Sequence, residues 1–275
     1  LSPAEGVLIE RRVSLLRALI EARAAFQRRD KARLQHLARE VEALPADAEV
    51  SWNMIPLNIA YWLNHSSQSP LIPRLQLARQ QLMQAGHYVA MIRVITLVGE
   101  ALIQSGQLQE AQRHCLQGLA LAEQLGVRTI TTGYLSVNLF DVFYAQNRLE
   151  EATDALRRFQ RIAQDWQEET LLALGEVSTV WLGLACGDLE VARQALHRME
   201  ALAEQREHAY ALRWVPIIRV ACWLAEAKLE EASAWAAQTI VSPQGWDPLD
   251  QEEYDEALML VRVALAQHKP AQAVE

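Results

Sequence analysis

The fold of this chain is decided by one short motif, which is clearest as Gly106-Gln107-Leu108-Gln109-Glu110-Ala111. A turn-forming residue is followed by Leu two positions later and by Ala three positions after that Leu. The motif returns around Ala152, Ala192 and Ala232, and in a weaker form around Ala273. Successive alanines are 41, 40, 40 and 41 residues apart. Intervals this regular are the signature of a structural repeat.

Each repeat unit is expected to form two helices. Before the turn, apolar residues recur at helical spacing, as in Val94, Val98 and Leu102, and a second apolar series follows the turn. The turn residues suit the left-handed conformation that ends a helix, since Gly187 and Asn147 adopt it more readily than other residues do. The small alanine allows two helix backbones to approach closely.

The repeats extend over the whole sequence, with Ser69 and Pro70 expected to open a helix after the second turn. No segment alternates as a strand does. The expected fold is all-α, a right-handed superhelix (α-solenoid) of tetratricopeptide-like helix pairs with a period of about 40 residues. We expect a single repeat domain over residues 1–275, as a fragment of a longer protein, with units near 8–45, 50–86, 88–127, 129–168, 170–206, 208–242 and 250–275.

Composition excludes several classes of protein. Of the 275 residues, 51% are hydrophobic, which excludes disorder, because such a chain can bury a large core. The net charge of -8, from 26 basic and 34 acidic residues, argues against nucleic acid or an anionic membrane as the main partner. The most apolar stretch, 88–103, is interrupted by Arg93 and Glu100, so no membrane span is expected.

The three cysteines are far apart and odd in number: Cys115, Cys186 and Cys222. This pattern does not form a disulfide framework, and we expect all three to be small buried hydrophobes. Unpaired cysteines are typical of a reducing compartment, which indicates a cytoplasmic protein.

Motifs for catalysis or cofactor binding are absent from the sequence, which contains no H-E-x-x-H, G-x-S-x-G, C-x-x-C or G-x-G-x-x-G. His197 and Glu200 share a helix face, but no third metal ligand is near in sequence, so we expect a solvated pair. The acidic cluster of residues 247–256 lacks the spacing of a calcium loop, and Asp250 with Glu253 is typical of a helix cap. We therefore expect no enzymatic activity, no cofactor and no metal.

A family resemblance rests on three features of the repeat. The segment Gly99–Ala111 looks like a tetratricopeptide unit, Leu125-Gly126 ends a unit, and the acidic segment Asp250–Tyr254 opens the last one. Together with the long period, these features resemble the superhelical sensor region of the maltose-regulon transcriptional activator and its LuxR-type, signal-transduction-ATPase relatives. The resemblance extends over nearly the whole chain.

The resemblance implies a sensor placed between a nucleotide-binding switch and a LuxR-type helix-turn-helix. The sequence departs from that pattern, because it contains no G-x-x-x-x-G-K-[ST] and nothing like a DNA-binding unit after Ala273. We therefore expect this segment to bind neither ATP nor DNA. What the resemblance carries over is a sensor role, with a small-molecule inducer or a regulatory protein as the partner.

Candidate ligand-binding residues come from the repeat register. By resemblance to the tetratricopeptide motif, inward positions on the first helix of a unit lie about 18 and about 11 residues before the aligned alanine. These positions, with Asn138 beside one of them, give Arg93, Glu100, Tyr134, Asn138, Asp141, Trp181 and Trp214.

The mixture of charged groups and flat rings at these positions suits a polar ring-containing ligand such as a sugar, and it suits a peptide equally well. Trp181 and Trp214 could instead pack between repeat units, as we expect of most of the eight tryptophans. The leading hypothesis is a ligand-sensing region of a LuxR-type regulator. The alternative is a constitutive tetratricopeptide scaffold that binds a peptide or protein.

Overall fold

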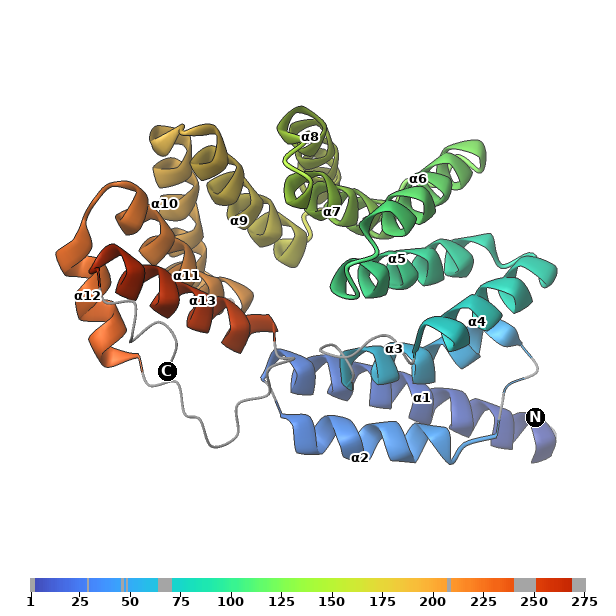
Figure 1. The fold of residues 1–275 in the computed structure, drawn as a ribbon. Helices are drawn as coiled ribbons and strands as arrows, with labels where there is room; N and C mark the ends of the chain where they lie inside the picture. The colour runs from blue at the N-terminus through green and yellow to red at the C-terminus, as the bar shows by residue number, and fades with distance from the viewer. Residues whose placement is uncertain are drawn as a thin grey trace. The chain divides into compact units, whose positions relative to one another are not determined.

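The computed structural model contains helices connected by turns, with no strand among the residues that it describes (Figure 1). The structure describes residues 3–28, 30–45, 47, 49–63, 71–206, 209–239 and 251–268. The chain divides into two compact units, Leu1–Asn138 and Leu139–Glu275. The division falls inside one helix, α7.

The helices of the first unit are α1 (Pro3–Gln27), α2 (Lys31–Glu42), the 3-10 helix η1 (Val50–Asn53), α3 (Met54–Leu63), α4 (Ile72–Gln84), α5 (Tyr88–Gln104) and α6 (Leu108–Gln124). Helix α7 (Ile130–Ala145) crosses the division. The second unit continues with α8 (Leu149–Trp166), α9 (Glu169–Cys186), α10 (Leu189–Arg206), α11 (Ala209–Ala225), α12 (Leu229–Gln238) and α13 (Gln251–Ala266).

The helices form successive pairs along the chain. Within a pair the two helices pack together, as α5 and α6 or α9 and α10 do. The first helix of a pair also contacts the first helix of the next pair, as α1 contacts α3 and α9 contacts α11. Contacts between neighbours of this kind define an all-α solenoid of helix pairs, so the predicted fold class is confirmed.

The aligned alanines lie in the core, and at one of them the close approach of two helices is shown directly. Ala111, Ala152, Ala192 and Ala232 are all buried. In α9, a Cβ atom added to Gly183 would lie 3.0 Å from the backbone nitrogen of Ala192 in α10. Any side chain at position 183 would press on this backbone, so α9 and α10 approach closely at this point.

Helices α4 to α9, α11 and α13 are each followed by a turn residue of positive φ. Gly106, Asn147 and Gly187 have φ values of 72°, 57° and 74°, which confirms the expected left-handed residues. At Gly187 the amide donates to the Leu184 carbonyl and the next amide donates to that of Gly183 at 2.8 Å. These two bonds form a Schellman motif, which satisfies carbonyls that the helix end leaves unpaired.

Helix α9 is the one described helix that is long and apolar enough to cross a membrane by length and composition. In this fold it is a core helix, because it contacts α8, α10 and α11. Its residues Leu171, Val177 and Val180 are buried. Glu176 of α9 pairs with Arg198 of α10 at 2.9 Å.

Several sequence expectations concern residues at the margins of the helices. Cys115 and Cys222 are buried as expected, but the expectation for Cys186 is wrong. Cys186 is exposed because it is the last residue of α9, directly before the turn. Four expectations lie outside the described residues: the Ser69-Pro70 helix start, the Asp250 cap, Trp246 and the Ala273 copy of the motif.

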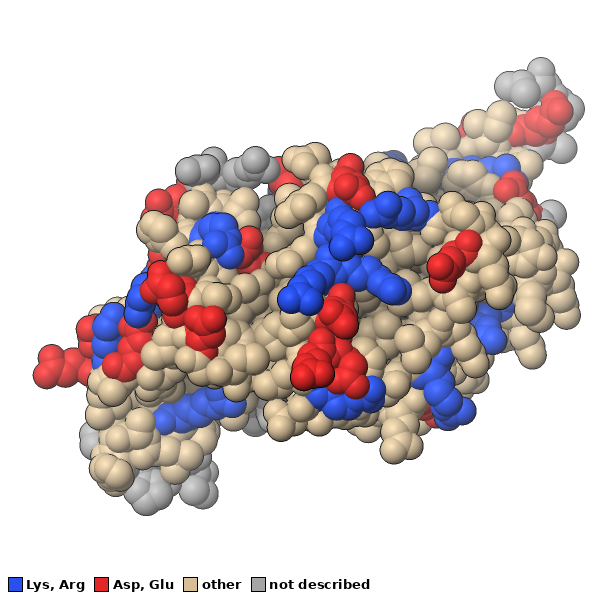
Figure 2. Space-filling model, turned by 90° about the horizontal axis from the view of Figure 1, so that it is seen from above, with Lys and Arg blue, Asp and Glu red and all other residues tan. Residues whose placement is uncertain are grey.

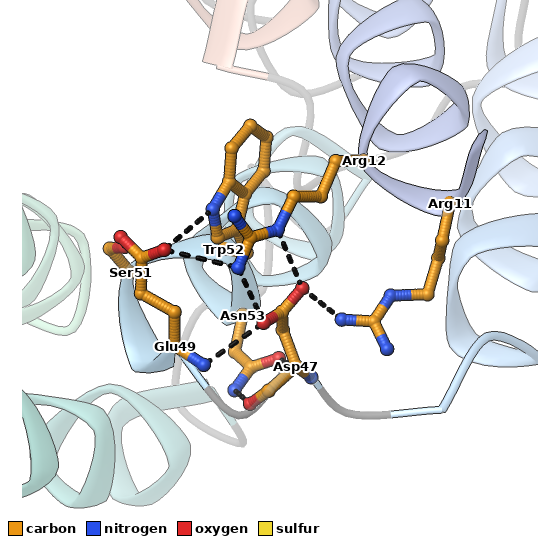
Figure 3. A network of polar contacts seen from close by, with 7 residues as sticks. All are labelled: Arg11, Arg12, Asp47, Glu49, Ser51, Trp52 and Asn53. Atoms are coloured by element: carbon orange, nitrogen blue, oxygen red, sulfur yellow. Dashed lines mark hydrogen bonds and ion pairs between the residues drawn. The ribbon is translucent and has the colours of Figure 1, made fainter. Parts of the chain in front are cut away.

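A polar network joins α1 to the segment before α3 (Figure 3). The buried carboxylate of Asp47 accepts hydrogen bonds from Arg12 Nε at 3.1 Å and Nη2 at 3.0 Å, and it also pairs with Arg11. The Arg12 guanidinium holds the pKa of Asp47 well below its usual value. The same guanidinium lies 4.9 Å from the ring centroid of Trp52. These contacts fix which face of α1 points inward.

We expect Ala227→Gly to stabilise the protein. Ala227 has a φ of 57°, in a region that costs an L-residue about 1–2 kcal/mol, and glycine regains only part of this because its unfolded state is more flexible. A gain of about 0.5–1 kcal/mol should appear in urea denaturation. The matched control is Gly187→Ala, which meets no atom within 4 Å and should destabilise by a similar amount through φ alone. Equal stabilities would contradict the left-handed assignment.

Asp47→Asn should lower the free energy of unfolding at pH 7 by roughly 1–3 kcal/mol, because it removes a charged acceptor from buried hydrogen bonds. The folded pKa of Asp47 lies below its usual value of 3.8, so its contribution is complete above about pH 5. That contribution is lost as the pH falls through 3.8 towards the folded pKa. Urea denaturation at pH 7 and pH 3 should show the gap between wild type and variant narrowing. An equal gap at both pH values would refute the role given to this carboxylate.

Candidate ligand-binding site

A half-buried polar cluster joins α3 and α5 in the first unit. Arg93 Nη2 of α5 donates to Asn58 Oδ1 of α3 at 3.3 Å, and the Asn58 amide donates to the carbonyl of Met54 at 2.8 Å. Tyr61 of α3 is buried beside Glu100. Burial and the negative charge of Glu100 raise the pKa of Tyr61 well above its usual value, while Arg93 opposes the shift. The cluster thus offers hydrogen-bond donors and acceptors, and it contains one positive and one negative charge.

An open hollow adjoins this cluster at the start of α5. It has a volume of about 490 Å³ and is lined by Gly86, His87, Tyr88, Val89, Ala90, Arg93 and Thr131. Arg93 therefore belongs to both the cluster and the hollow. The exposed ring of Tyr88 offers a flat surface beside it.

Two other predicted site residues of the first unit lie on α7. Tyr134 is half-buried. Asn138 is buried, and its Nδ2 donates to the Thr96 carbonyl of α5 at 2.9 Å. A Cβ atom on Gly99 would lie 3.0 Å from that Nδ2 atom, so Asn138 fills the contact between α5 and α7. Its amide serves helix packing.

The tryptophans of the second unit pack against its core. Trp181 and Trp214 are each half-buried and touch the same two hydrophobic clusters, one around Met199 and one around Met259. The Trp214 ring also lies 6.0 Å from that of Tyr210, centroid to centroid. Among the described residues, the buried indole N–H of Trp214 has no hydrogen-bond acceptor. Packing between repeat units is therefore a role of both rings.

Asp141 is the exposed member of the predicted set in the second unit. It lies on α7 three residues before Tyr144, whose hydroxyl donates to the Trp181 carbonyl at 3.4 Å. Burial raises the pKa of Tyr144, and the positive charge of Arg262 on α13 opposes this shift. Arg262 thus lies near the C-terminal end of α7.

The seven predicted residues form two sets, one in each unit. The structure brings Arg93 and Glu100 together around Tyr61, and it brings Trp181 and Trp214 together on shared core clusters. Ligand contact by any of the seven stays a prediction. Asn58, Tyr61 and Tyr88 were missed by the sequence analysis. A signal existed only for Tyr88, which is an aromatic residue at a helix start five positions before Arg93.

Charges of both signs are interspersed on the surface. Lys and Arg side chains lie close to Asp and Glu side chains on the face drawn in Figure 2. Some charged side chains of the molecule are paired, such as Arg193 of α10 with Glu226 of the turn after α11 at 2.7 Å. His197 and Glu200 are 3.4 Å apart, as expected, and His197 is exposed. Among the described residues no group of three His, Cys, Asp or Glu side chains could hold a metal ion.

The paired helices, the buried aligned alanines and the contacts between successive first helices define a tetratricopeptide-type solenoid. The family described as the MalT-like TPR region matches residues 17–275, and the chain belongs to this family. The predicted recognition is therefore confirmed, and the chain has the character of a sensor or regulatory region of a MalT-type regulator. None of the curated proteins matches the sequence.

We expect Trp214→Ala to lower the free energy of unfolding by about 2–3 kcal/mol, somewhat less than the loss of a fully buried tryptophan. The reason is that the half-buried ring contacts two core clusters. Trp166→Ala is the matched control, because Trp166 is half exposed, and it should change stability by less than about 0.5 kcal/mol. Denaturant midpoints of the two variants provide the comparison. Equal midpoints would mean that Trp214 carries no packing role.

Proposed function

We propose that this chain is the ligand-sensing region of a bacterial LuxR-type transcriptional regulator and that it binds a small polar inducer or a regulatory partner. The observation that carries the proposal is the cluster of Asn58, Tyr61, Arg93 and Glu100 beside the open hollow at the start of α5. Membership of the MalT-like family supports the same role. The proposed setting is the cytoplasm, in accord with three free cysteines.

The chemistry of the hollow favours a ligand with several hydroxyl groups. In the hollow, Arg93 supplies donors and the Tyr88 ring provides a face on which a sugar ring can stack, while Glu100 of the adjoining cluster supplies acceptors. A ligand that leaves one of these half-buried groups unpaired would be penalised, which gives specificity. This role requires no covalent bond to be made or broken, so the proposed activity is binding and not catalysis.

Sensing requires that the ligand bind one arrangement of the regulator more tightly than another. The hollow is suited to this, since it is lined by the turn before α5 as well as by Arg93 inside α5 and by Thr131 of α7. A ligand that holds these three parts together would favour the arrangement in which they are close. The balance of charges on the surface makes DNA or another polyanion a poor partner for this segment.

The test is calorimetric titration with neutral oligosaccharides, short peptides, ATP and duplex DNA. A neutral oligosaccharide should bind, and Arg93→Ala should weaken it at least tenfold, because a charged hydrogen-bond donor is lost. The melting temperature should change little, since Arg93 makes one long side-chain bond. Arg157→Ala is the matched control, because it removes an arginine from the exposed surface of α8. This variant should bind the oligosaccharide as wild type does.

Three outcomes would count against the proposal. Binding of peptides alone would indicate the constitutive scaffold. Salt-sensitive DNA binding would contradict the expected partner class. Equal affinity of wild type and Arg93→Ala for the sugar would move the ligand away from this hollow.

A further inference from the structure

Helix α1 has two apolar faces. The inner face carries Leu15, Ala18, Ala22 and Ala25, which are buried against α2 and α3. The outer face carries Ile9, Val13, Leu16 and Ile20, which are 46%, 58%, 44% and 70% exposed. Both sets advance in steps of three and four residues, so each forms a straight stripe along the helix.

The two stripes lie on roughly opposite sides of α1, because about 100° of rotation per residue separates their members by roughly 100–240°. A surface helix of a globular protein normally has one apolar stripe and a polar opposite face. A helix that is apolar on both sides has a partner on each side. Helix α1 packs against α2 and α3 (Figure 1), while Ile9, Val13, Leu16 and Ile20 stay exposed among the described residues.

We propose that the outer stripe of α1, formed by Ile9, Val13, Leu16 and Ile20, binds the same stripe of a second copy of this chain in an antiparallel helix pair. The stripe has the spacing of a coiled-coil seam, with Val13 and Ile20 at the first position of the heptad and Ile9 and Leu16 at the fourth.

The stripe is symmetric about its own midpoint. In an antiparallel pair Ile9 of each copy packs on Ile20 of the other, and Val13 packs on Leu16, so all four layers are filled by apolar side chains. Such a self-complementary patch is what a two-fold dimer interface requires.

Flanking charges select the antiparallel direction. In that direction Glu10 of each copy faces Arg17 of the other, and these charges attract. In a parallel pair Glu5 would face Glu10, so that contact would join like charges. Among the described residues the Glu10 carboxylate has no ion-pair partner within its own chain, whereas Arg17 also reaches Glu40 at 3.3 Å.

Helix α1 is already folded in the monomer, so dimerisation carries no free-energy cost of forming it. Isolated helices with four apolar layers are marginal in water, but α1 is already held by its inner face and by the Asp47 network. The contact is small, so we expect weak association, with a dissociation constant on the order of 10–100 µM.

Sedimentation at rising concentrations of the chain tests the association. Wild type should form dimers, and Leu16→Glu should weaken dimerisation at least tenfold. The matched control is Leu77→Glu, an apolar-to-acidic change at an exposed position of α4, which should dimerise as wild type does.

Glu10→Lys should weaken dimerisation at least threefold at low salt, because it places two cations together. Unchanged melting temperatures at low protein concentration will show that the variants fold.

Cross-linking tests the direction, in a background in which the exposed Cys186 is replaced by Ser. Ile9→Cys with Ile20→Cys in one chain should give a disulfide-linked dimer on oxidation, whereas Ile9→Cys alone should not. The two cysteines cannot close within one helix, since they are about 16 Å apart along its axis. A monomer at all concentrations, dimerisation unaffected by Leu16→Glu, or cross-linking by Ile9→Cys alone would overturn the proposal.

Discussion

Two helices can bring their backbones together only where both have small side chains at the crossing point. In this protein the condition is met where Gly183 of α9 meets Ala192 of α10, and a buried alanine stands at the same place in the units of Ala111, Ala152 and Ala232. Ala192 is the clearest case, since it lies so close to Gly183 that even a methyl group on the glycine would press on its backbone. Once the crossing point is fixed, the turn between the helices must be short, and a short turn requires a residue of positive φ. The period of the sequence follows from these two local conditions.

Much of the fold could be predicted because its determinants are local. The Leu-x-x-Ala motif and its turn residue give the start of the second helix in α6, α8, α10 and α12, and the turn residues were predicted as left-handed at Gly106 and Gly187. Gln167 also has a positive φ, at 51°, and nothing in the sequence indicated this. There the packing of α8 against α9 imposes the conformation on a residue that does not favour it. The prediction for Cys186 was wrong because this residue is the last of α9, and a residue at a helix end is exposed even where its residue type favours burial.

The candidate site was predictable only along the first helix of each unit. The repeat register identified Arg93 and Glu100, which do lie in one polar cluster. Their partners Asn58 and Tyr61 come from α3, whose unit lacks the aligned motif, so no register reached them. The repeat register also predicts on which side of a helix a residue lies, but it does not predict how deeply its side chain is buried. Asn138 points towards α5 and is buried against it, and Trp181 and Trp214 pack on the core.

The closure of each turn by backbone bonds has a consequence for how proteins of this kind can change over evolutionary time. Because the Schellman motif uses amide and carbonyl groups only, the side chains of a turn are free to vary as long as one residue tolerates a positive φ, and glycine, asparagine, glutamine, alanine and histidine all occupy that position here. Helix lengths have no such freedom. A single inserted residue inside α10 would rotate every later side chain by about 100° and turn the residues after the insertion away from their neighbours. Substitutions should therefore accumulate in the turns, while insertions and deletions inside the helices should be rare.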